Sequence, residues 1–425
     1  MTSKLATLVA ATAALLAAWT GAATAQQVKE LTFWSHWAAE VPKRTFVEQA
    51  IKEFEAKNPN IKIKPTWYEK TALYAGLKTA LRADQAPDIF YAEPDQIEYM
   101  ENGFLLDLSG LNWAAVEPWA KDSWAYKGKF YGLPLEAWTV ELYYNTKTMA
   151  DLGVAIPANL QMSPDAFLDM VKKAKAKNIT PMSLGVGDRP YPGAHIVHEA
   201  LLKRLGVDDY GQLLAGKLAW TDPRVVDTLQ WTKTLTDAGM LPTTFTSLKL
   251  AEAHGYFHTN PGALTFLNGS WYTSRAFNPV DKGGQPTDFP LGIMQFPAVP
   301  GAVCNECRSI AVGGGYVGNA MTKNAKEVLA FFNSFLTPEM GNRWLDVVKV
   351  QTGIKSDPAK MTDKQAAEYF AKIEKTNAGA KYFFGIPIQV MTGKPKEVFT
   401  QVFNNAFPAG NISIDDAVKQ MQAAY

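Results

Sequence analysis

The sequence predicts an α/β protein of two lobes, each a mostly parallel sheet flanked by helices. The chain has 425 residues, and single hydrophobic cores stop growing near about 250 to 300 residues, so two domains are expected. Between residues 30 and 91, short strand-like runs alternate with helical patterns, which is typical of a parallel sheet covered by helices. A second α/β series begins near Ala137.

The composition is that of a folded globular protein without excess charge. The chain has 42 Lys and Arg residues against 41 Asp and Glu residues, and 47% of its residues are hydrophobic. This balance argues against a nucleic-acid-binding protein and against an acidic disordered tail. The 12 Trp residues offer flat faces that can serve a ligand, although burial in a core is their commoner fate.

The N-terminal segment 1–25 is predicted to be a secretory signal peptide. It carries Lys4, an apolar stretch over 5–19 and a small-residue cleavage site before Gln26. A retained membrane anchor is the alternative, but the apolar part is short for one. No later stretch has about 18 uninterrupted apolar residues, so no second membrane span is expected. No cysteine near the cleavage site can accept a lipid, so the mature protein is not expected to be a lipoprotein.

Within the first series, each element has its own pattern. The run 30–34 alternates as a strand does, and apolar residues recur at three- and four-residue spacing over 46–54, which predicts a helix. A strand at 61–64, a helix at 74–81 and a strand at 87–91 follow. Ligands of such sheets gather beyond the carboxyl ends of the strands. That rule points to residues 35–37, 68–69 and 93–96.

The second series continues the alternation. A strongly β-prone run at 138–144 begins it, and the extended, proline-punctuated run 289–297 suits a connection between lobes. Further strands are predicted at 262–266 and 309–312, and further helices at 164–177, 195–205, 223–238 and 323–336. The last third of the chain is mainly helical in pattern.

The only two cysteines, Cys304 and Cys307, are three residues apart in a loop. In an exported protein they are expected to form a small disulfide that stabilises the fold little, because the closed loop is short. A redox-active pair is the alternative, but no strand precedes them and no helix opens at them as in a thioredoxin-like unit. A zinc site would need two more ligands nearby.

Patterns of nucleotide and metal chemistry are weak. The glycine run at 313–318 matches G-x-G-x-x-G after a strand, but no helix opens at its third glycine, so a loop with close backbone approach is expected. His254 and His258 are four apart and are expected to be hydrogen-bonded or solvated rather than a metal pair. We therefore expect no metal and no cofactor.

Five carboxylates fit two kinds of site. They suit the acid pair of a glycoside hydrolase, and equally a cleft that accepts hydrogen bonds from sugar hydroxyls. These residues are Glu69, Glu93, Asp95, Glu136 and Glu141.

Seven motifs in a fixed order resemble the extracellular solute-binding proteins of the carbohydrate type (family 1), the capture components of bacterial ABC importers. They are LTFWSH at 31–36, the helical pattern 46–58 ending in NPNI at 58–61, APDIF at 86–90, YGLP at 131–134 with YYN at 143–145, LNGSW at 267–271, GGG at 313–315 and FLTPE at 335–339. Together they cover essentially the whole mature chain. The cysteine pair and the His-rich stretch 188–198 depart from the family pattern.

This resemblance implies a periplasmic-binding-protein fold, in which two lobes joined by two or three crossovers close on a ligand. Carried onto this sequence, the first lobe is 26–137 plus 290–337 and the second is 138–289 plus 338–425. The implied function is periplasmic capture of a sugar, polyol or sugar derivative and its delivery to an inner-membrane ABC permease. The protein would act as a monomer and would not be an enzyme. A secreted carbohydrate-active enzyme is the alternative, because it would use the same tryptophan faces and carboxylates.

The family's cleft positions can be matched residue by residue. Trp37 lies past a strand end and is expected at the ligand, whereas Trp34 alternates with strand residues and is expected in the core. Trp271 is either a stacking platform or a core residue. Arg189 and Arg343 would contact the ligand only if it is anionic, and are otherwise solvated or salt-bridged. The matched ligand-binding positions are His36, Trp37, Tyr68, Glu69, Glu93, Asp95, Glu136, Trp138, Gly187, Asp188, Trp271, Gly315 and Tyr316.

Overall fold

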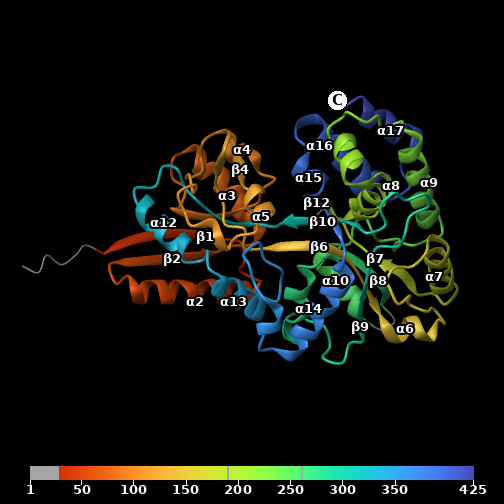
Figure 1. Ribbon diagram of the computed structural model, residues 1–425, viewed down its shortest axis with the longest axis horizontal. Coiled ribbons are helices and arrows are strands. Elements are labelled where there is room, and N and C mark those ends of the chain that lie inside the picture. The colour runs from red at the N-terminus through yellow and green to blue at the C-terminus, as the bar shows by residue number, and fades with distance from the viewer. Residues whose placement is uncertain (1–27, 189–190, 260–261) are drawn as a thin grey trace, which may run out of the picture.

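Two lobes joined near the middle make up the molecule in the computed structural model (Figure 1). The structure describes residues 28–188, 191–259 and 262–425. The predicted signal peptide with its cleavage site before Gln26, and Arg189, lie outside the described residues. The predicted α/β class with two lobes is confirmed, because the two large sheets are separate and each is covered by helices.

The first sheet has four strands in the order β11-β3-β1-β2. Strand β1 runs parallel to β2 and β3, and β11 runs antiparallel to β3. Their bounds are β1 Lys29–Ser35, β2 Ile61–Trp67, β3 Ile89–Ala92 and β11 Gly315–Gly318. Helix α2, Val41–Lys57, buries Phe46, Val47, Ala50, Ile51 and Phe54, the face that the apolar spacing predicts. The other helices of this lobe are α3 Lys70–Arg82, α4 Ile97–Glu101, α5 Pro118–Asp122, α12 Ala325–Asn333 and α13 Pro338–Val348.

The second sheet has the order β12-β10-β6-β8-β7, and β9 also pairs with β6. Strand β6 runs antiparallel to β8, β9 and β10, so this sheet is mixed, whereas a mostly parallel one was predicted. The parallel pairs are β7 with β8 and β10 with β12. The bounds are β6 Ala137–Asn145, β7 Thr180–Ser183, β8 Ala263–Gly269, β9 Leu291–Met294, β10 Cys307–Val312 and β12 Lys381–Phe384.

The helices of the second lobe cover this mixed sheet. Helix α8 packs on β10, β12 and β8, and α10 packs on β7 and β8. A residue with φ of 76°, Gly206, breaks α8 into two helical parts. The bounds are α6 Thr146–Asp151, α7 Pro164–Ala176, α8 His195–Leu214, α9 Pro223–Asp237, α10 Leu250–His258, α11 Tyr272–Ala276, α14 Lys364–Asn377, α15 Pro387–Val390, α16 Gly393–Gln401 and α17 Ile414–Gln422. A small hairpin, β4 Ala125–Tyr126 with β5 Lys129–Phe130, belongs to the first lobe.

The expected lobe boundaries are wrong at two places. Strands β9 and β10 were expected in the first lobe, but both pair with β6 in the second sheet. Helix α13 was expected in the second lobe, but it packs on α2, where the rings of Trp344 and Phe46 lie 5.1 Å apart. In both cases the partner is far away in the sequence, and local patterns do not specify it.

The chain crosses between the lobes three times, and the crossovers are joined by backbone hydrogen bonds. The first lies before β6, the second between β10 and β11, and the third follows α13. The amide of Gly313 donates to the carbonyl of Glu136 at 2.8 Å, and the amide of Ala137 donates to the carbonyl of Gln351 at 2.8 Å. The three crossing segments therefore form one narrow connection.

Candidate functional site

A cavity of about 520 Å³ lies between the lobes, next to the crossovers. Both lobes contribute to its walls. The lining residues are His36, Ala39, Glu40, Lys43, Glu69, Lys70, Tyr74, Tyr91, Glu93, Asp95, Glu136, Trp138, Asp188, Leu250, Ala251, His254, Trp271, Arg275, Asn278, Lys282, Gly283, Gly313, Gly314, Ile386, Ile388 and Gln389. Eight of the thirteen predicted ligand-binding residues are among them: His36, Glu69, Glu93, Asp95, Glu136, Trp138, Asp188 and Trp271.

Trp37 does not line the cavity, which corrects its prediction. The chain turns after β1 so that this ring is fully buried, with its centroid 5.1 Å from Tyr316 and 5.8 Å from Trp344. Tyr316 is also fully buried, and its hydroxyl lies 3.0 Å from the hydroxyl of Ser35. Both residues therefore belong to the core of the first lobe.

Tyr68 and the two predicted glycines also lie outside the cavity lining. Tyr68 packs edge-on against Trp34, with ring centroids 5.4 Å apart. A Cβ on Gly187 would lie 2.3 Å from the carbonyl oxygen of Ser247, and Gly315 is equally crowded, so both are glycines for close backbone packing. Their neighbours Gly313 and Gly314 line the cavity instead.

Arg343 is salt-bridged on the outside of the first lobe. Its guanidinium contacts the carboxylate of Glu53 at 2.7 Å and the side-chain oxygen of Gln49 at 3.0 Å, both on α2. It is not among the residues that line the cavity. Of the two readings predicted for it, the salt-bridged one describes its position.

On the wall of the first lobe, Glu93 accepts several hydrogen bonds. Its carboxylate receives Lys70 at 2.5 Å, the hydroxyl of Tyr74 at 2.9 Å and that of Tyr91 at 3.2 Å. Burial alone would raise the pKa of Glu93, but the charge and hydrogen bond of Lys70 outweigh it and hold the pKa at about 2. Glu93 is therefore an anion fixed in position at neutral pH.

The neighbouring Asp95 behaves in the opposite way. Burial, and then the charge of Glu93, raise its pKa to about 6. Lys396 of α16, in the other lobe, lies 3.7 Å from its carboxylate and donates to its backbone carbonyl at 3.1 Å. This contact joins the two lobes across the cavity, at a point away from the crossovers.

At the first crossover, Lys43 binds two carboxylates. It is 3% exposed and lies 2.7 Å from both Glu136 and Glu40. Burial lowers the pKa of Lys43, but the two carboxylates outweigh it and the net shift is upward, so the ammonium stays charged. His36 beside them is neutral, because burial and the charge of Lys70 lower its pKa to about 3.

On the wall of the second lobe, two tryptophans meet. The rings of Trp138, from β6, and Trp271, just after β8, lie 4.6 Å apart at 89°. Trp271 is 8% exposed and its ring folds over Gly269, where a Cβ would lie 1.7 Å from the ring. Trp271 is thus largely buried and still lines the cavity. Asp188 accepts the amide of Leu250 at 2.8 Å.

Several lining residues were not predicted from the sequence. Glu40 is the residue before α2, Lys43 lies in the first turn of α2, and Lys70 opens α3, so all three lie at the start of the helix that follows a strand. Extending the strand-end rule into the first turn of the next helix would have found them. No local signal marks Arg275 and Asn278, which come from α11 and the turn after it.

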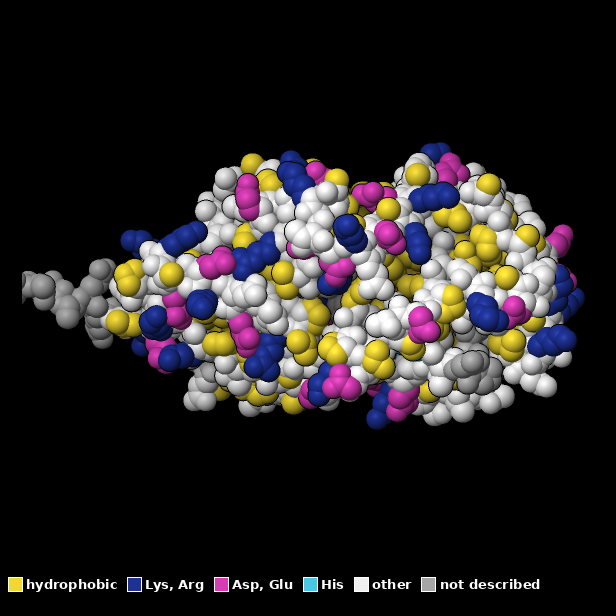
Figure 2. Space-filling view, turned by 90° about the horizontal axis from the view of Figure 1, so that it is seen from below, with side chains coloured by type: hydrophobic (Ala, Val, Ile, Leu, Met, Phe, Trp, Pro, Cys, Tyr) yellow, Lys and Arg dark blue, Asp and Glu magenta, His cyan; other side chains and the backbone are white. Residues whose placement is uncertain are grey.

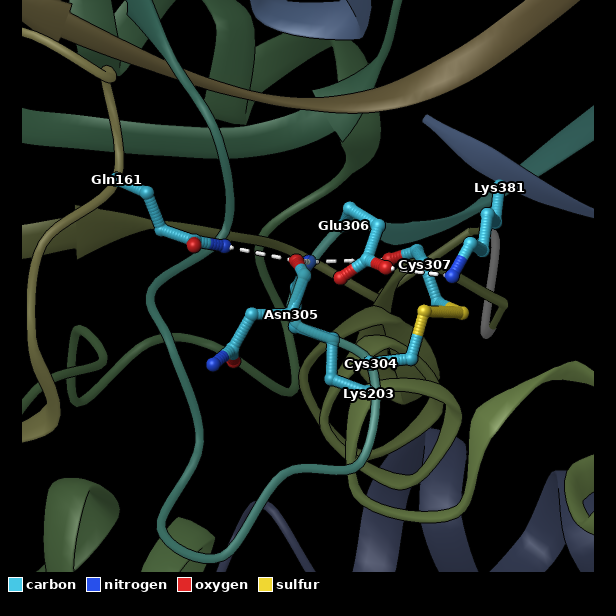
Figure 3. The surroundings of a disulfide bond; sticks show 7 residues. All are labelled: Gln161, Lys203, Cys304, Asn305, Glu306, Cys307 and Lys381. Carbon is cyan, nitrogen blue, oxygen red and sulfur yellow. Dashed lines mark hydrogen bonds and ion pairs between the residues drawn. A yellow bond between two sulfur atoms is a disulfide. The ribbon is translucent and has the colours of Figure 1, made fainter. Parts of the chain in front are cut away.

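The two histidines contact polar side chains, and the two cysteines close a small loop. Nε2 of His254 lies 3.0 Å from Nδ2 of Asn268, and His258 contacts the hydroxyl of Tyr272. In the described ranges, no group of three or more His, Cys, Asp or Glu side chains could hold a metal ion. Cys304 and Cys307 form a disulfide just before β10 (Figure 3).

Comparison with known families decides the class of protein. Residues 38–342 match the model of the bacterial extracellular solute-binding proteins. The chain belongs to this family. An extracellular family implies export, and its members are binding proteins rather than enzymes. Within residues 28–188, 191–259 and 262–425, no helix is both long and apolar enough to span a membrane.

Individual relatives of this solute-binding protein agree with the family match. A multiple sugar-binding protein of Streptococcus mutans is 24% identical over 356 residues, which are 80% of this chain and 79% of that protein. A maltotriose-binding protein of Pyrococcus abyssi is 31% identical, but over only 27% of this chain and 26% of that protein.

Solved structures share the fold. A chitin oligosaccharide binding protein superposes with a TM-score of 0.77 at 25% identity, covering 93% of this chain and 97% of that chain. A structure from work on xylan utilisation by Caldanaerobius polysaccharolyticus gives a TM-score of 0.79 at 23% identity, over 93% of this chain and 99% of that chain.

Proposed function

We propose that this solute-binding protein captures a sugar, a polyol or a sugar derivative in the cavity between its lobes and delivers it to an inner-membrane ABC permease. One observation carries the proposal: the cavity joins two tryptophan rings on one wall to hydrogen-bonding carboxylates on the other. A pyranose presents an apolar C–H face and a rim of hydroxyls, which need these two kinds of surface. Relatives with sugars in their names support this class of ligand.

Ligand contacts in this proposal come from both lobes. Trp138 and Trp271 contact the apolar face of the sugar, and carboxylates of the first lobe accept hydrogen bonds from its hydroxyls. Glu93 is suited to that role, because its low pKa keeps it an acceptor at neutral pH. The remaining proposed contacts are His36, Glu69, Asp95, Glu136 and Asp188, with Lys70 added from the structure.

Binding in this proposal closes the lobes about the three crossovers. The described parts of the first lobe would be 28–136 plus 314–349, and those of the second would be 137–313 plus 350–425, as the strand pairing and the packing of α13 support. The protein would act as a monomer in the periplasm, cleaved before Gln26 and without a lipid anchor. On the face in Figure 2, side chains of both charge signs are interspersed, which suits a protein that does not bind nucleic acid.

A ligand screen tests the proposal. The mature chain would be melted in the presence of mono- and oligosaccharides, since a ligand at 100 times its dissociation constant adds about 2.7 kcal/mol to the folded state. We expect at least one sugar to raise the melting temperature and to lower the radius of gyration in solution scattering. Binding of no sugar would contradict the ligand class. Release of product from glycosides on long incubation would favour a glycoside hydrolase instead.

A further inference from the structure

The end of the cavity formed by the second lobe holds an arginine that lacks a counter-ion. Arg275, on α11, lines the cavity, and its Nη1 is buried without a hydrogen-bond partner. Among the described residues, no carboxylate lies within ion-pair distance of its guanidinium. By contrast, Lys43 and Lys70 each bind a carboxylate in the same cavity. A buried guanidinium nitrogen without an acceptor is unfavourable, so a ligand that supplies an acceptor is expected to bind there.

A second donor lies close to this arginine. His254 also lines the cavity, and its Nδ1 is buried without a partner. Burial, and then the nearby charge of Arg275, hold the pKa of His254 well below its usual range, so the ring is neutral. Because Nδ2 of Asn268 donates to its Nε2, the proton of the neutral ring lies on Nδ1. The histidine therefore offers a donor beside the guanidinium.

The carboxylates of Glu40 and Glu136 are bound by a lysine rather than by Arg275. Glu40 is near enough for Arg275 to lower its pKa, but burial and Lys43 affect that pKa more, and its carboxylate pairs with Lys43 at 2.7 Å. Glu136 pairs with the same lysine. Lys282 lines the cavity as well and lies 3.7 Å from only one carboxylate, that of an exposed neighbour. Asp188 adds a carboxylate to this wall, so what distinguishes Arg275 here is its unpaired nitrogen rather than an excess of positive charge.

The first-lobe wall of the cavity carries three further carboxylates. Glu69, Glu93 and Asp95 line it, with Lys70 bound to Glu93 and Lys396 beside Asp95. Carboxylates there suit neutral hydroxyl groups and would repel an anion. The cavity therefore offers hydroxyl acceptors on the first-lobe wall and an unpaired guanidinium nitrogen on the second-lobe wall, which suits a ligand with unlike ends.

We infer that the ligand is a sugar that carries an oxyanion, either a carboxylate or a sulfonate, and that Arg275 binds this group. The inference rests on the proposed function and specifies the ligand class. A guanidinium presents a planar pair of N–H donors that matches such an oxyanion, and charge-assisted hydrogen bonds are stronger than neutral ones. His254 donates a further hydrogen bond, and the sugar ring extends toward the two tryptophans and the carboxylates of the first lobe.

Calorimetric titration with matched sugars tests this inference. The pairs are D-glucose with D-glucuronate and D-galactose with D-galacturonate, together with the corresponding uronate and neutral disaccharides. Glucose with a sulfonate at C6 distinguishes a sulfonate from a carboxylate ligand. We expect an acidic member to bind at least about tenfold more tightly than its neutral partner, and its affinity to fall with added salt.

Two arginine variants locate the effect. Arg275→Gln is expected to weaken binding of the acidic sugar roughly 10- to 100-fold and to remove the preference over the neutral partner, as expected for a hydrogen bond to a charged group. Arg275→Lys should retain part of the preference for the acidic sugar. Arg343→Gln is the matched control, because that arginine is paired with Glu53 outside the cavity, and it should bind as the parent does. Thermal melting of each variant shows that it is folded.

The outcomes separate this inference from the function on which it rests. Tighter binding of a neutral member would overturn the anionic ligand and leave a sugar-binding protein. An acidic preference that survives Arg275→Gln would overturn the role of Arg275. Binding of no sugar, neutral or acidic, would contradict the proposed function and the inference together.

Discussion

Replacing Gly269 with alanine is expected to displace the ring of Trp271. Gly269 ends β8, opposite Val140 of β6, and a Cβ there would lie 1.7 Å from Cζ3 and 2.1 Å from Cε3 of Trp271. No such contact is tolerated, so either the ring or the backbone moves. The ring also meets Trp138, whose centroid is 4.6 Å away. The ring is therefore expected to swing out of its present position in the cavity wall.

The size of the effect follows from the two things that the ring does. Forcing an extra methyl group into packed surroundings costs about 1 to 3 kcal/mol of stability. With an unfolding entropy of about 2.1 cal/mol/K per residue over a chain of this length, that lowers the melting temperature by about 1 to 3 °C. Losing an apolar platform for the ligand costs about 1 to 3 kcal/mol of binding free energy, which weakens binding roughly 5- to 150-fold.

Melting and calorimetric titration with the best sugar of the screen measure the two effects separately. Gly255→Ala is the matched control, because it makes the same change inside helix α10 where nothing lies within 4 Å of the added Cβ. It should raise stability by about 0.5 to 1 kcal/mol and leave the affinity unchanged. If Gly269→Ala and Trp271→Ala both bind as the parent does, the ring is not a platform and the reasoning is refuted.

Three further variants address the charged residues and the disulfide. Lys43→Met leaves the buried carboxylate of Glu136 and the partly buried one of Glu40 without their lysine. It should lower the free energy of unfolding by about 3 to 5 kcal/mol in urea titration at pH 7; no loss would mean that the carboxylates are solvated. The pKa of Asp95 is raised to about 6, so as the pH falls the folded state binds this proton before the unfolded state does. The stability that the protonated residue contributes is therefore lost as the pH rises through about 6. Asp95→Asn should therefore have a higher melting temperature than the parent at pH 7 and the same melting temperature near pH 4. A lower melting temperature than the parent at pH 7 would contradict the raised pKa. The double variant of Cys304→Ser with Cys307→Ser should bind sugar within about threefold of the parent and lose at most about 2 kcal/mol of stability, since the closed loop is short; a larger loss of affinity would place that loop in the ligand site.

The minor role expected of the disulfide has a structural basis. Nζ of Lys203 donates to the carbonyls of Asn305 at 2.6 Å and Cys307 at 3.0 Å, and the amides of Val303 and Cys304 donate to the carbonyl of the same lysine. These bonds hold the loop without the sulfur bridge. Figure 3 shows Gln161 and Lys381 reaching the loop from either side: Gln161 donates a hydrogen bond to the carbonyl of Asn305, and Lys381 forms an ion pair with Glu306.

The sequence predicted those parts of the fold that depend on local patterns. The apolar face of α2 was predictable because helical spacing alone determines which residues share a face. Membership of a sheet was not, because β10 pairs with β6, about 170 residues earlier, and nothing in either strand names its partner. The mixed direction of the second sheet has the same cause.

The candidate site shows the same division. His36, Glu69 and Glu93 were found because the carboxyl ends of neighbouring parallel strands converge at one edge. Trp37 was misplaced because the direction of a side chain beyond a strand end depends on how the chain turns. Arg275 was missed because it is brought to the cavity by tertiary packing alone.

The ion pair between Asp95 and Lys396 affects how strictly closure of the lobes depends on bound ligand. It needs no ligand atom, so it favours closed lobes whether or not sugar is present. A partly exposed pair is worth about 0.2 to 1 kcal/mol, which raises the closed fraction of the empty protein by up to about fivefold. A permease that recognises closed lobes would then meet more empty carriers. The same ion pair lets the lobes close at a lower sugar concentration. It therefore raises sensitivity to scarce sugar and lowers discrimination against empty carriers.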